Sequence, residues 1–170
     1  MSLALADYKL HVFSRSQLNL SGNRLGPEGA KALAPALVRG SLTSLSLGDN
    51  NLGDEGVQAL SVGLKDSKSL ATLDLSNRSS FSTKFGPKGA TALASAIAVM
   101  PSLTAIGKGG LNLKGNRLHD EGWGAIFTGV CSNKDSKIAS IDTRGESIGL
   151  PGAKVIAKAL QESVAASLSE

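Results

Sequence analysis

The amino-acid sequence predicts an α/β solenoid of about five strand–turn–helix units. A five-residue block that begins with a large apolar residue and ends with glycine recurs at 25–29, 52–56, 85–89, 118–122 and 148–152. Alternating residues before each block, apolar in the first four copies, are typical of a short strand with one buried face. Apolar residues four and eight positions after each closing glycine lie on one face of a helix. A repeat of this length indicates units that stack on their neighbours.

The spacing of the units indicates two insertions. The step from Leu20 to Leu47 is 27 residues, whereas the equivalent step from Leu75 to Leu113 is 38. Part of the excess is placed in residues 79–84, where a loop is expected to protrude after the third strand. The rest is placed near 106–110, where a strand that starts at 103–106 is expected to break at a glycine-rich loop and to restart at Leu111.

The two ends of the chain are expected to differ from the units between them. Residues 1–17 are predicted to form an N-terminal cap or a partial repeat, and residues 18–170 the solenoid with a C-terminal capping helix. Thr143 replaces a strand leucine, and the last residues are mainly polar, as the ends of repeat arrays need to be. Because the edges of a parallel sheet carry unpaired backbone groups, we expect a monomer or weak self-association through an end.

The second unit carries the most complete motif, Leu42-Thr-Ser-Leu45-Ser-Leu47-Gly-Asp-Asn50-Asn-Leu52. This L-x-x-L-x-L-x-x-N-x-L pattern, repeated in phase over residues 14–165, resembles the leucine-rich repeat of the ribonuclease-inhibitor-like subfamily. The resemblance implies a leucine-rich repeat solenoid, a horseshoe arc with a parallel sheet on its concave side and helices on its convex side. Parallel strands need a crossover connection, and each unit supplies a helix for it.

Three asparagines are predicted to be structural. Asn23, Asn50 and Asn116 each stand three residues after the last strand leucine, where a side-chain amide can pair with backbone groups that turn away from the strand. Arg78 and Glu146 occupy this position in the third and fifth units. The column of amides is therefore expected to break at those two units.

Composition and charge narrow the class of protein. The net charge is +4, and the single cysteine, Cys131, has no internal disulfide partner. No apolar run reaches the roughly 18 residues of a membrane span. These features predict a cytoplasmic or nuclear protein without membrane contact. The lysines are dispersed among acidic residues without interleaved aromatic rings, which argues against nucleic acid as a partner.

The sequence offers no catalytic, metal or cofactor site, so a non-enzymatic protein is predicted. Cys131 lies at the end of a helical apolar ladder, and the two histidines, His11 and His119, are too far apart for a zinc pair. The Gly107-Lys108-Gly109-Gly110 segment lacks the frame of a phosphate-binding loop. Trp123 replaces a small residue of the other units at the first helical turn, and we interpret it as a packing adjustment that fills space left by Gly124.

Candidate protein-binding residues belong to two surfaces. Outward strand positions on the predicted concave face are Asn19, Ser46, Asp74, Asn112 and Asp142. Loops that leave the strands supply a basic rim with one aromatic ring: Arg78, Phe81, Lys84, Lys114, Arg117 and Arg144. In the resembling family, partner contacts are commonly made by these two kinds of position.

The predicted function is a protein–protein interaction module whose partner is another protein. One alternative is a regulator of a partner enzyme, such as a GTPase-activating protein resembling the Ran activator. Another is a sensor-domain fragment of a larger receptor. The remaining alternative is a solvated sheet face that holds no ligand.

Overall fold

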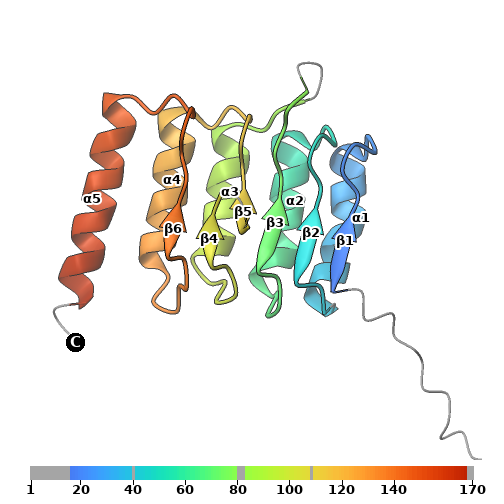
Figure 1. The fold of residues 1–170 in the computed structure, drawn as a ribbon, viewed down its shortest axis with the longest axis horizontal. Coiled ribbons are helices and arrows are strands. Elements are labelled where there is room, and N and C mark those ends of the chain that lie inside the picture. The colour runs from blue at the N-terminus through green and yellow to red at the C-terminus, as the bar shows by residue number, and fades with distance from the viewer. Residues whose placement is uncertain (1–15, 40, 80–82, 108, 168–170) are drawn as a thin grey trace, which may run out of the picture.

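The structure is a computed structural model that describes residues 16–39, 41–79, 83–107 and 109–167. Figure 1 shows a row of strands in front of a row of helices, with each helix beside the next. The predicted cap over residues 1–17 lies almost entirely outside the described residues. The predicted α/β solenoid is confirmed.

The described residues form six short strands and five helices in alternating order. The strands are β1 (Gln17–Asn19), β2 (Ser44–Ser46), β3 (Thr72–Asp74), β4 (Ala105–Ile106), β5 (Leu111–Asn112) and β6 (Ser140–Ile141). The helices are α1 (Gly26–Arg39), α2 (Gly53–Lys65), α3 (Pro87–Ile97), α4 (His119–Ser132) and α5 (Leu150–Ser167). Each helix packs against the helices of the adjacent units, as expected of a solenoid.

The sheet is parallel throughout, but its strand order departs from the chain order at one place. The order is β1-β2-β3-β5-β4-β6, so β5 returns to lie between β3 and β4. Ile106 of β4 is in register with Leu111 of β5, and β6 then pairs with β4. The chain therefore passes twice through the strand position of the fourth unit, which confirms the predicted break and restart. One strand is added here without a helix of its own.

The core lies between the two layers and is built from aliphatic columns. Leu45, Leu73 and Leu111 are paired neighbours across β2, β3 and β5, and each is at most 1% exposed. Helix residues such as Leu60 and Leu93 pack against them. Glycine allows close helix contact on the other side, because a Cβ at Gly63 would clash with the backbone of Ala34.

The three asparagines pair with backbone groups of the turns, as predicted, and two of them also connect successive units. Asn50 is 2% exposed; its Nδ2 donates to the carbonyls of Leu20 (2.8 Å) and Leu47 (3.0 Å), and its Oδ1 accepts the backbone N–H of Asn23 (2.9 Å). Asn116 repeats the pattern with the carbonyls of Leu75 and Leu113. These amides satisfy backbone groups that the turn would otherwise leave unpaired.

Aspartates at the start of two helices cap the helices of the following units. Oδ1 of Asp54 in α2 accepts the backbone N–H groups of Gly86 and Gly89, both at 2.8 Å, at the beginning of α3. Asp120 in α4 does the same for Gly149, at 2.6 Å, before α5. The first N–H groups of a helix have no partner within the helix, so a carboxylate from the neighbouring unit stabilises it.

The terminal helix α5 exposes apolar side chains. Leu150 is 70% exposed and Val164 is 58% exposed. The role of α5 as a closing element stays a prediction. Within the described residues, no helix has both the length and the apolar character that a membrane span requires.

Replacing Asn50 with alanine is expected to lower the free energy of unfolding by about 3 kcal/mol, because several backbone groups lose a buried partner. Urea denaturation followed by circular dichroism measures the change. Asn23→Ala is the matched control, since Asn23 is exposed and its amide serves only its own turn. Its expected loss is about 1 kcal/mol. Equal losses in the two variants would contradict the cross-unit role of Asn50.

Asp54→Ala is expected to lower the free energy of unfolding by about 1–2 kcal/mol, because two N–H groups at the start of α3 lose their acceptor. Thermal and urea unfolding provide the measurement. Gln58→Ala, an exposed change in the middle of α2, is expected to alter stability by less than about 0.5 kcal/mol. An Asp54→Ala variant as stable as this control would show that the cap contributes nothing.

Candidate functional site

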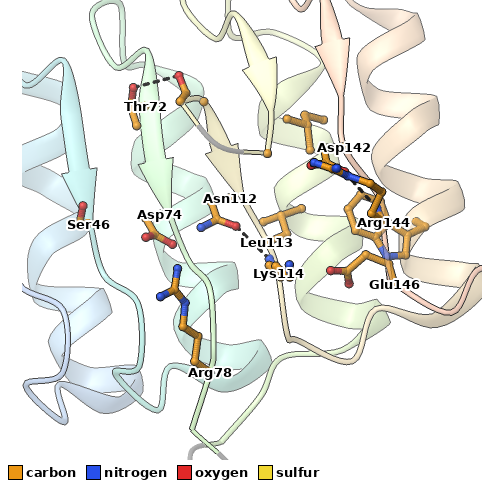
Figure 2. Close-up of a pocket in the computed structure, with 15 residues that line it drawn as sticks. Ser46, Thr72, Asp74, Arg78, Asn112, Leu113, Lys114, Asp142, Arg144 and Glu146 are labelled. Carbon is orange, nitrogen blue, oxygen red and sulfur yellow. Dashed lines mark hydrogen bonds and ion pairs between the residues drawn. The ribbon is translucent and has the colours of Figure 1, made fainter.

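The open face of the sheet contains a hollow of about 430 Å³ at the place where β4 ends. Gly107 follows β4 with φ +121°, and a Cβ there would lie 2.9 Å from the Cβ of Asp142, so glycine is required for the turn. Figure 2 shows the space beyond β4, with Leu113 and Lys114 on one side and Asp142, Arg144 and Glu146 on the other. The hollow is therefore a direct product of the restarted strand.

Most of the sequence-predicted site residues line this hollow. They are Ser46, Asp74, Arg78, Asn112, Lys114, Asp142 and Arg144. Lys84 and Arg117 instead line a second hollow of about 260 Å³ among the strand-to-helix loops, which Lys114 also borders. Asn19 lies on β1 and lines neither hollow. Phe81 lies outside the described residues.

Several of the predicted strand residues also form hydrogen bonds that stabilise the turns after the strands. The Oδ1 atoms of Asn19, Asp74, Asn112 and Asp142 each accept the backbone N–H two residues further on, at 2.8–3.2 Å. This local turn directs the chain away from the strand. The side chains thus keep only part of their hydrogen-bonding capacity for a partner.

The loop arginine and the strand aspartate of the fifth unit form a two-point ion pair. Nε and Nη2 of Arg144 donate to Oδ1 and Oδ2 of Asp142 at 2.9 and 2.7 Å. These bonds hold the pKa of the Asp142 carboxyl well below its usual range. Both side chains remain at the surface, so the pair orders the rim of the hollow while salt and water screen its attraction.

Two cations at the hollow have no such partner. Among the described residues, the structure records no ion pair or side-chain hydrogen bond for Arg78 or for Lys114. Figure 2 shows the Arg78 side chain extending along the sheet face toward Asp74. Both cations lie beside carboxylates, so the rim carries charges of both signs rather than a uniformly basic surface.

Glu146 and Trp123 line the hollow and were absent from the predicted site. Glu146 is half-buried, and this burial raises the pKa of its carboxyl, while the backbone N–H of Gly115 and the indole N–H of Trp123 lower it by less. Trp123 is 1% exposed, and its Nε1 has no aligned hydrogen-bond acceptor. The Glu146 carboxyl is therefore within electrostatic reach of the indole without a full hydrogen bond.

The sequence did contain a signal for both residues. Glu146 stands where other units have the structural asparagine, and Trp123 stands where Ala30, Val57 and Ala90 are fully buried. The expected reason for the tryptophan is wrong, however. Gly124 makes room for Val155 of α5, because a Cβ at Gly124 would lie 2.8 Å from Cγ1 of that valine. Trp123 lines the hollow on the sheet side instead.

The described residues show little that suggests redox or metal chemistry. They contain no group of three or more histidine, cysteine, aspartate or glutamate side chains arranged to hold a metal ion. Burial raises the pKa of the Cys131 thiol, which disfavours the reactive thiolate. The residues that line the hollow offer hydrogen-bonding groups and charges of both signs.

Comparisons with known proteins agree with the fold. A family model described as Leucine Rich repeat matches residues 16–34 and 41–61. A solved structure described as "Leiomodin-1 Actin-Binding Site 2 (ABS2)" is 14% identical, with a TM-score of 0.60, and the match covers 92% of this chain and 87% of that one. The tropomodulin C-terminal domain of Caenorhabditis elegans is 16% identical, with a TM-score of 0.55, over 89% and 85% of the two chains. No curated protein matches in sequence. At these identities the solved structures show a shared fold.

The substitution Glu146→Gln is expected to stabilise the protein relative to wild type increasingly as pH rises. Burial raises the pKa of Glu146, so the stability that its neutral form contributes is present below the ordinary pKa of about 4.3 and is lost as pH rises through the raised value. Glutamine stays neutral and keeps a carbonyl acceptor. Free energies of unfolding from pH 3 to pH 8 provide the measurement, and a difference that stays constant over this range would contradict the assignment.

Proposed function

Because the chain is a leucine-rich repeat protein, we propose that it is a protein-interaction module that binds a partner protein through the open face of its sheet. The contact surface is the hollow at the end of β4 together with the adjoining strand-to-helix loops. The membership in the ribonuclease-inhibitor-like subfamily stays a prediction.

The observation that carries this proposal is the charged lining of the hollow. It brings Arg78, Lys114 and the Asp142–Arg144 pair together around one depression. Charges of both signs at fixed positions favour a partner with the complementary pattern, which contributes to specificity more than to affinity. Arginine is also among the residues that most often dominate protein interfaces.

Actin is one specific candidate partner whose binding can be tested directly. One structural neighbour is described as an actin-binding site, but its 14% identity supports the fold rather than the partner. A regulator of a partner enzyme and a fragment of a larger receptor stay alternatives. For the regulator, three loop arginines are relevant: Arg78 and Arg117 are exposed and have no recorded ion pair among the described residues, whereas Arg144 is held by Asp142.

The double substitution Arg78→Ala and Lys114→Ala is expected to reduce partner binding at least tenfold, because it removes both unpaired cations from the hollow. The measurement is affinity capture from a lysate of the source organism, with co-sedimentation against filamentous actin as the named probe. The matched control is Lys65→Ala with Lys88→Ala, which removes two exposed lysines from the helices.

Circular dichroism of both double variants is the control for folding. A protein that wild type and control retain and that the hollow variant loses would support the proposal. If wild type, the control variant and the hollow variant all captured the partner equally, the contact surface would lie outside the hollow. Co-sedimentation of wild type alone would identify actin as the partner.

A further inference from the structure

Exposed apolar side chains on α5 lie along one stripe of the helix. The stripe consists of three large and two small residues, all of them exposed: Leu150, Ala153, Ala157, Leu160 and Val164. They follow one another at alternating steps of three and four residues, which places them on one narrow face over about four helical turns. This is the spacing by which one helix packs along a second helix.

Most of these positions are buried in the units inside the array. Leu160 is 49% exposed, whereas its equivalents are at most 3% exposed: Leu37, Leu64 and Ile97. Ala153 is exposed, although the equivalent residue is buried in all four earlier units. Figure 1 shows that α5 lies at the end of the row of helices, beyond β6, the last strand of the sheet. The face that the other helices bury is therefore open in α5.

The order of large and small side chains along the stripe fits a second copy of the same helix. Consider two antiparallel α5 helices related by a two-fold axis midway between residues 157 and 160. Leu160 of each copy then faces Ala157 of the other, and Val164 faces Ala153. Each of these large side chains meets a small one, so the two rows interdigitate. In a parallel pair each residue would face its own copy, with large against large and small against small.

The charges beside the stripe are compatible with this antiparallel pair. Lys154 and Gln161 border the stripe on one side, and both are exposed. The two-fold axis brings Lys154 of one copy beside Gln161 of the other, so no two like charges face each other. The ion pair between Lys158 and Glu162 lies away from the stripe and stays intact.

We propose that α5 is a dimer interface, through which two copies of this chain associate by antiparallel packing of their terminal helices. An interface of this two-fold kind closes at two copies and does not propagate. One pair of helices buries less than the roughly 1,200 Å² of a standard interface, so the expected dissociation constant is on the order of 10–100 µM. The described residues that line the hollow include none of α5, so the inference goes beyond the proposed function and does not depend on it.

Sedimentation velocity of the full chain, from about 5 µM to about 500 µM, measures the association. Val164→Glu is expected to weaken dimerisation at least tenfold, because the two-fold axis puts two new carboxylates into an apolar contact. Val62→Glu is the matched control, since Val62 is an exposed valine of α2 outside the stripe. It is expected to leave the dissociation constant unchanged. Circular dichroism of both variants is the control for folding.

Disulfide cross-linking tests the direction of the two helices. Cys131→Ser removes the single native thiol, and the introduced cysteines are compared in that background. A mixture of the Ala153→Cys and Val164→Cys chains is expected to form cross-linked heterodimers, because these positions face each other in the antiparallel pair. Each chain alone is expected to stay unlinked, since the two copies of residue 153 lie about 16 Å apart along the helix axis.

A wild-type chain that stays monomeric at the highest concentration would overturn the inference and leave the stripe to a helix of a different protein. Dimers that survive Val164→Glu but are lost with Val62→Glu would also overturn it. Cross-linking of each cysteine chain with itself would contradict the antiparallel packing. The Arg78→Ala and Lys114→Ala variant is expected to dimerise as wild type does, so loss of partner capture and loss of dimerisation are measured separately.

Discussion

Parallel strands lie about 4.8 Å apart, whereas packed helices need 8–10 Å, and this mismatch governs the molecule. A unit with one strand and one helix can satisfy both spacings only if the stack bends toward its strands. In the sheet, β4 lies between β5, which leads into α4, and β6, which leads into α5, so two strand spacings accompany the one helix spacing from α4 to α5. The mismatch disappears at that step. The helices remain in contact, and the sheet widens to form the hollow.

The same step changes how backbone groups are satisfied. Elsewhere each unit donates to the next through its main chain, with Asn50 and Asn116 bridging the turns and Asp54 and Asp120 capping the following helix. These contacts connect neighbouring units only, so an irregularity in one unit stays local. At the fourth unit the sheet is irregular, and Glu146 and Trp123 line the hollow beside β4.

Local patterns in the sequence were sufficient for the fold and for much of the candidate site. The recurrence of Leu45, Leu73 and Leu111 in phase predicted the column of strands, and the glycine-rich stretch after Ile106 predicted the restart. Strand alternation placed Ser46, Asp74, Asn112 and Asp142 on one face. These inferences succeeded because a repeat fold depends on contacts between residues at fixed separations.

The sequence by itself therefore determined the strand–turn–helix unit, the positions at which the unit recurs, and the place where the repeat is interrupted. Only the tertiary structure decided the strand order around β5, the pairing of Arg144 with Asp142, and the meeting of Glu146 with Trp123. The physical reason is that a loop of four residues between Ile106 and Leu111 can lead the chain to either side of β4. The choice depends on which side offers unpaired backbone groups, and β3 supplies them only in the assembled sheet.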